Sequence, residues 1–117
     1  MGKLLAVLTT MKFRIFLTAD HGNVEAVGSG VPQEGVLADQ RGQRVRVYPT
    51  QELRAAAAAA LPASSSWDPV GLPPGLLPLF PAPRAAFATV GSRVVAHGGP
   101  SIEEIVVPWI EIRREAL

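Results

Sequence analysis

The chain contains no cysteine, which excludes disulfide bonds and every metal site that depends on thiolate ligands. Its formal net charge is only +1, so it lacks the strongly basic surface that drives binding to nucleic acids. No apolar run approaches the roughly 20 residues that span a bilayer, and Lys12 and Arg14 interrupt the N-terminal run that could pass for a signal peptide. We therefore expect a cytoplasmic protein with no membrane segment and no direct nucleic-acid contact.

Charged and aromatic residues are also scarce, at 18% and 6%, whereas hydrophobic residues make up 48% of the 117 positions. A composition this apolar predicts a folded chain with a buried core rather than a disordered one. The length suits a single domain, so we expect residues 1–117 to form one unit.

Three short helices are predicted by local patterns. The first covers residues 2–10, where leucines recur on one face. Thr50 has the chemistry of an N-cap and predicts a helix through residue 61, which Pro62 then ends. Ser101 and Glu104 have the spacing of a capping box, which predicts a further helix of one or two turns.

Strands and loops fill the remainder. Glycines along residues 19–43 predict a long loop with at most a short strand at 36–38. The proline-rich segment 67–84 predicts an irregular chain laid over an apolar surface. Strands are expected over 12–18, which reads as buried, and over 44–48, 85–89, 93–96 and 107–112, with 85–89 and 93–96 paired as a hairpin.

The two histidines of the chain occur in matching settings, because each follows a strand-like run and precedes a glycine. In open α/β sheets, functional side chains gather at the carboxyl ends of the strands, so these distant positions can converge. A carboxylate and imidazoles together suit zinc or manganese, which makes Asp20, His21 and His97 candidate metal ligands. The simpler alternative is that Asp20 caps a turn and that both histidines are ordinary polar residues.

Other charged residues have two interpretations each. Glu103 and Glu104 could bind a metal or act as a general base, but their position at a helix start favours capping. Arg41, Arg44 and Arg46 could hold a phosphate, since guanidinium groups bind such anions with two hydrogen bonds. Their alternation with apolar residues favours a solvated strand face instead.

Three segments resemble a known family. Residues 17–25, which contain Asp20 and His21, closely resemble the metal-binding segment of the alkaline phosphatase superfamily. Residues 97–108 resemble the closing motif of its PglZ branch, and residues 41–48 are also similar to that branch. The resemblance runs in order from about residue 4 to residue 112 and implies an α/β fold. The implied architecture is a small mixed sheet with short helices, equivalent to the C-terminal part of an alkaline phosphatase-like domain.

The resemblance also implies a two-metal site, in which Asp20 and His21 bind one ion and His97 binds the other. Family members need a Ser or Thr nucleophile and further upstream ligands, and Thr9, Thr10 and Thr18 do not stand at the nucleophile position. We therefore expect no catalytic residue here, but the ligand-bearing part of a PglZ-type hydrolase that is not catalytic alone. Full-length relatives are associated with phage resistance.

Two other functions stay open. The chain could complete a two-metal phosphatase or phosphodiesterase together with another chain, or it could be a non-enzymatic interaction module. An incomplete domain would leave a sheet edge and apolar surface exposed. We therefore expect a homodimer, or a partner chain that supplies the missing N-terminal part.

Overall fold

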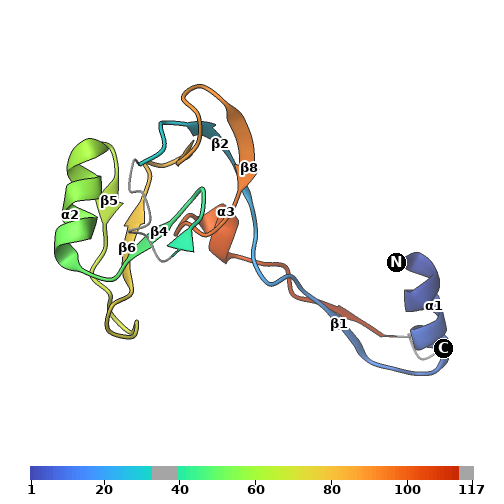
Figure 1. Ribbon diagram of the computed structural model, residues 1–117. Helices are drawn as coiled ribbons and strands as arrows, with labels where there is room; N and C mark the ends of the chain where they lie inside the picture. The colour runs from blue at the N-terminus through green and yellow to red at the C-terminus, as the bar shows by residue number, and fades with distance from the viewer. Residues whose placement is uncertain (33–39, 114–117) are drawn as a thin grey trace.

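The computed structural model describes residues 1–32 and 40–113, and the proposed strand at 36–38 lies outside them. Helices and runs of strands share the chain, as expected for a mixed α/β protein (Figure 1). The helices are α1 (Gly2–Thr10), α2 (Gln51–Ala60) and α3 (Ile102–Ile105). The strands are β1 (Ile15–Leu17), β2 (Val24–Gly28), β3 (Gln40–Arg41), β4 (Arg46–Tyr48), β5 (Ser65–Ser66), β6 (Leu77–Phe80), β7 (Ala85–Ala86), β8 (Arg93–Ala96) and β9 (Ile110–Ile112).

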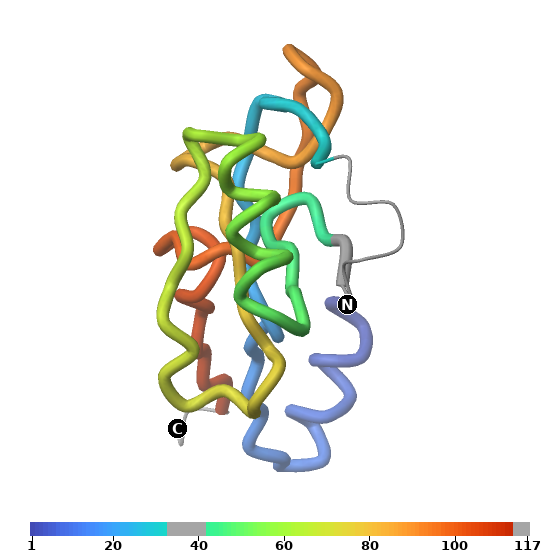
Figure 2. The backbone as a smooth tube through the Cα atoms, turned by 60° about the vertical axis from the view of Figure 1, so that its left-hand side comes forward, coloured from blue at the N-terminus to red at the C-terminus, as the bar shows by residue number. Residues whose placement is uncertain are grey.

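The molecule consists of a body and a long arm (Figures 1 and 2). Its radius of gyration is 19.4 Å, whereas about 13 Å is typical of a compact chain near this length. The arm contains α1 and the two-stranded ribbon of β1 and β9. Rings of Phe16 and Trp109 lie 5.4 Å apart on the ribbon, and Arg14 pairs with Glu111 at 2.8 Å. The body contains α2 and the other two sheets.

One half of the body is a four-stranded sheet in the order β3-β4-β6-β5, which packs against α2. The predicted N-cap is confirmed, because the Thr50 hydroxyl accepts a hydrogen bond from the backbone N–H of Leu53. Buried side chains from α2, β4, β6 and the segment after β7 form the core: Tyr48, Ala57, Leu79 and Phe87. The three residues of β4 are all buried, so the expectation of a solvated face on 44–48 was wrong.

The other half is a three-stranded sheet in the order β7-β2-β8, with β2 in the middle. β2 runs parallel to β7 and antiparallel to β8, so the sheet is mixed. Strand β2 lies within residues 19–43, which were expected to be a loop. The expected hairpin of 85–89 with 93–96 was also wrong, because β2 lies between these two segments and pairs with both.

Further expectations need correction. The strand expected over 12–18 is limited to β1 and is not buried, because the ribbon has no body beneath it. Segment 67–84 contains β6, in which Pro78 lies opposite Val47 without an N–H to donate. The capping box and helix after Ser101 are confirmed. The mixed α/β class is confirmed as well, but the strands in the described part of the chain form three sheets rather than one.

No helix within the described residues is long and apolar enough to cross a membrane.

Candidate metal site at the paired histidines

The imidazole rings of His21 and His97 are stacked, with their centroids 3.8 Å apart and their planes at 13°. The pairing of β2 with β8 explains how positions so distant in the chain meet. β2 begins three residues after His21, β8 ends immediately before His97, and Val24 lies opposite Ala96 in the antiparallel register. The amino end of β2 therefore meets the carboxyl end of β8 at one edge of the sheet.

The two histidines were expected to meet because each follows the carboxyl end of a strand, and this holds for only one of them. His97 does follow the carboxyl end of a strand, but His21 follows β1, which belongs to a separate ribbon. The strand that positions His21 is β2, which was not predicted because the glycines of residues 19–43 favoured a loop. The sequence signal that could have found β2 is the placing of charged Glu25 between apolar Val24 and Ala26, although the exposed residue Val27 is apolar and weakens the alternation.

Asp20 lies beside His21 and orients it. One carboxylate oxygen, Oδ1, accepts a hydrogen bond from the His21 backbone N–H at 3.0 Å, and the other, Oδ2, lies 3.6 Å from His21 Nε2. On the opposite side of the ring, Nδ1 lies 2.9 Å from the Gly22 carbonyl oxygen. A carbonyl only accepts, so Nδ1 donates this hydrogen bond, and Nε2 is the ring nitrogen that faces the Asp20 carboxylate. A backbone carbonyl holds many metal-binding histidines in this way.

The three predicted ligands fit a divalent ion in part. Two ligands of one tetrahedral zinc lie roughly 3.4 Å apart, because each bond is about 2.1 Å long, and the 3.6 Å from Asp20 Oδ2 to His21 Nε2 suits this. His97 cannot share that ion, because the lone pairs of stacked rings lie in nearly parallel planes and do not converge. The described part of the chain holds no group of three or more acidic or imidazole side chains able to bind one metal.

The glycine after His21 is required by close packing. Its backbone N–H donates to the carbonyl oxygen of Glu104 at 2.8 Å, which places it directly against α3. A Cβ at Gly22 would overlap the carbonyl oxygen of Glu103, so a larger residue would force the two segments apart. The His-Gly signature at this position therefore has a steric cause.

Glu104 forms a buried ion pair that the sequence did not reveal. Its carboxylate accepts two hydrogen bonds from Arg44, at 3.0 and 2.9 Å, and one from the Gly99 backbone N–H at 2.8 Å. Burial alone raises the pKa of Glu104, but the hydrogen bonds from Arg44, Ser101 and Gly99 outweigh it and lower the pKa from 4.5 to about 2. The carboxylate is therefore ionised at every ordinary pH and serves the fold, as the capping interpretation of Glu104 predicted.

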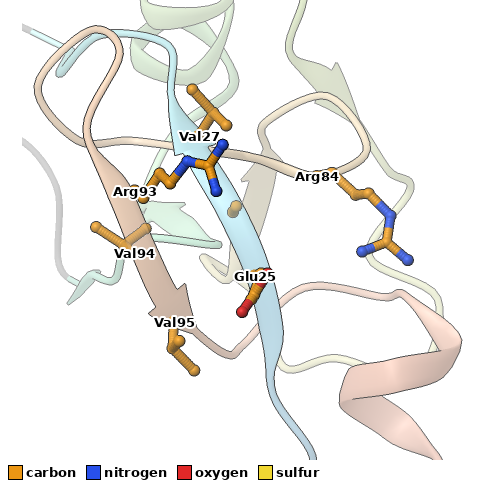
Figure 3. A pocket seen from close by; sticks show the side chains of 7 residues that line it. Glu25, Val27, Arg84, Arg93, Val94 and Val95 are labelled. Atoms are coloured by element: carbon orange, nitrogen blue, oxygen red, sulfur yellow. The ribbon is translucent and has the colours of Figure 1, made fainter.

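A shallow pocket of about 370 Å³ lies on the exposed face of β2 and β8 (Figure 3). The pocket is lined by Glu25, Ala26, Val27, Arg84, Arg93, Val94 and Val95. Arg84 contacts Glu103 at 2.6 Å. The pocket thus carries charges of both signs around valine side chains.

Comparison with known proteins identifies the family of the chain. No curated protein and no solved structure matches it. The family model described as the BREX system PglZ alkaline phosphatase-like domain matches residues 1–112, which is nearly the whole chain. The resemblance drawn from residues 17–25, 41–48 and 97–108 is thereby confirmed. The chain belongs to the PglZ family of alkaline phosphatase-like domains.

Proposed function

We propose that this PglZ-family chain binds divalent metal through Asp20, His21 and His97, and that it does not hydrolyse phosphate esters by itself. The observation that carries the proposal is the stacking of the two imidazoles at 3.8 Å. Two polar rings from segments 76 positions apart (97 − 21) meet here beside a carboxylate. Asp20 and His21 would hold one zinc or manganese ion, and His97 would belong to a second.

Metal ions at such a pair of sites would stabilise the attacking and leaving oxygens of a phosphoryl transfer when bound. The chain's own contribution is to orient the ligands. The Gly22 carbonyl accepts a hydrogen bond from Nδ1 of His21, which would leave Nε2, beside Asp20, for coordination. Asp20 supplies the negative charge that favours a cation there.

The surroundings of the three threonine hydroxyl groups near the N-terminus support the proposal that the chain does not catalyse hydrolysis by itself. The hydroxyl groups of Thr9 and Thr10 donate to helix carbonyls within α1, on the arm. The Thr18 hydroxyl lies 3.4 Å from the carbonyl oxygen of Ala19, its neighbour in the chain. Within residues 1–32 and 40–113, none of the three is engaged by an imidazole or carboxylate that could activate it as a nucleophile.

The alternative is a two-metal phosphatase or phosphodiesterase completed by another chain, and the arm favours it. Apolar side chains on α1 and the ribbon are exposed to an extent unusual for a free surface, among them Leu4, Val7, Phe13 and Trp109. A second copy of this chain, or a chain with the N-terminal part of the domain, would bury them. A non-enzymatic interaction module would use the same surface.

The test is calorimetric titration with Zn²⁺ and Mn²⁺. The double substitution His21→Ala, His97→Ala should abolish binding, and Asp20→Ala should weaken it at least about tenfold, or about 1.4 kcal/mol. Asp68→Ala, which removes an exposed carboxylate elsewhere, is the matched control and should bind like the unmodified chain. Equal affinity of the double variant and the unmodified chain would contradict the proposal.

A hydrolysis assay then separates the alternatives. With saturating Mn²⁺ or Zn²⁺, the isolated chain should not hydrolyse p-nitrophenyl phosphate or its bis ester. Turnover that rises with the square of chain concentration would favour a site completed by a second copy. A chain that binds neither ion would be better described as an interaction module.

A further inference from the structure

Both histidine-glycine segments are attached to one residue, Glu104. Its backbone carbonyl accepts the N–H of Gly22, the residue after His21, at 2.8 Å. Its side-chain carboxylate accepts the N–H of Gly99, two residues after His97, also at 2.8 Å. Glu104 therefore bridges the segment that enters β2 and the segment that leaves β8, and these two segments carry the stacked rings.

Arg44 holds that carboxylate in place. Its Nε and Nη2 atoms donate to the two carboxylate oxygens, and the two side chains are only 2% and 1% exposed. Nη1 of Arg44 donates to the carbonyl oxygens of Ala82 and Ala85. The planar guanidinium is thus engaged on all sides, which leaves the carboxylate no freedom to turn away from Gly99.

The packing around the pair is equally restrictive. A Cβ at Gly99 would lie 2.8 Å from Glu104 Oε2 and 2.9 Å from Arg44 Nη2, so the loop after His97 is pressed directly onto the ion pair. On the other side, Gly22 lies against the backbone of α3. Neither segment can move without disturbing Glu104.

We propose that the buried Arg44–Glu104 pair is the positioning device that holds His21 and His97 against each other. Neither side chain is a ligand, and both act through the backbone of the two glycine segments. That the device serves metal binding rests on the proposed function, whereas its role in stacking the rings does not. The Arg84–Glu103 pair is exposed by comparison, although Glu103 directly precedes Glu104 in α3.

Nuclear magnetic resonance of a histidine-labelled chain tests whether the Arg44–Glu104 pair holds the rings together. The chain has only two histidines, so the signals of each ring can be assigned without overlap. With a chelator present, the unmodified chain should show a nuclear Overhauser effect between the rings and upfield ring-current shifts. Arg44→Met combined with Glu104→Leu removes both buried charges while keeping apolar volume. This variant should lose the ring-to-ring effect and bind Zn²⁺ at least about tenfold more weakly.

The matched control is Arg84→Met combined with Glu103→Leu, which removes the exposed pair and should keep both properties. Retention of the ring-to-ring effect in the Arg44, Glu104 variant would overturn the proposal. Should that variant not fold, exchange of the Gly99 amide hydrogen in the unmodified chain decides. We expect protection comparable to that of the core amides, and an unprotected Gly99 would overturn the proposal. A ring contact without metal binding would contradict only the proposed function.

Discussion

Glu104→Ala is expected to lower the free energy of unfolding by about 3–5 kcal/mol, the largest effect of any single substitution considered for this chain. The substitution leaves the Arg44 guanidinium buried without its carboxylate, since the side chain is only 2% exposed. It also leaves the buried N–H of Gly99 without its acceptor. A small domain is commonly stable by only about 5–15 kcal/mol, so a loss of this size should be obvious.

Urea denaturation followed by tryptophan fluorescence measures the effect. Glu103→Ala is the matched control, because Glu103 precedes Glu104 in α3 and its ion pair with Arg84 is solvent-exposed. Exposed pairs contribute about 0–1 kcal/mol, so the control should unfold near the midpoint of the unmodified chain. Similar midpoints for the Glu104 and Glu103 variants would show that the buried pair is not a major source of stability.

Gly22→Ala should cost about 2–3 kcal/mol, because the added Cβ would overlap the carbonyl oxygen of Glu103. Both atoms belong to backbones, so the strain cannot be relieved by turning a side chain. The segment carrying His21 must move away from α3, which lengthens the hydrogen bond from Gly22 to Glu104.

The control for this substitution is Gly2→Ala, at the start of α1, where a Cβ meets no atom within 4 Å. There alanine should be neutral or stabilising by up to about 1 kcal/mol. Thermal unfolding of the two variants distinguishes steric overlap from a general glycine effect. A Gly22→Ala chain as stable as the Gly2→Ala chain would contradict the packing described for α3.

Features set by neighbouring residues were predictable from the sequence. The cap at Thr50 and the capping box of Ser101 with Glu104 depend on contacts three residues apart, and both are present. The turn before β8 also follows from a local rule, since Gly91 has a φ of 78°, which glycine adopts readily. Family membership was predictable because its motifs are short and contiguous.

Features set by distant partners were not predictable in the same way. Segments 85–89 and 93–96 looked like a hairpin because they are close in sequence, but β2 pairs with both and separates them. The alternation of Arg44 to Tyr48 suggested a solvated face, whereas the partner that buries Arg44 lies 60 residues away in α3. Pro78 argued against a strand, yet β6 has neighbours on both sides. Each of these outcomes depends on a non-local contact.

The candidate site contains features set by neighbouring residues and features set by distant partners. Asp20, His21 and His97 were recognised from type and local context, and the stacked rings now place two of them together. The burial of Arg44 against Glu104 was not predicted, because nothing near Arg44 in the sequence indicates a buried carboxylate partner. The assignment of a metal to these residues stays a prediction.

The proposal that Asp20, His21 and His97 bind divalent metal is tested by a zinc titration of histidine-labelled chain, monitored through the signals of its two imidazole rings. Both imidazoles should respond to the ion over one concentration range, because an ion held beside one ring changes the surroundings of the other, whose centroid is 3.8 Å away. A chain in which one ring signal moves while the other keeps its position and linewidth at saturating zinc would contradict it.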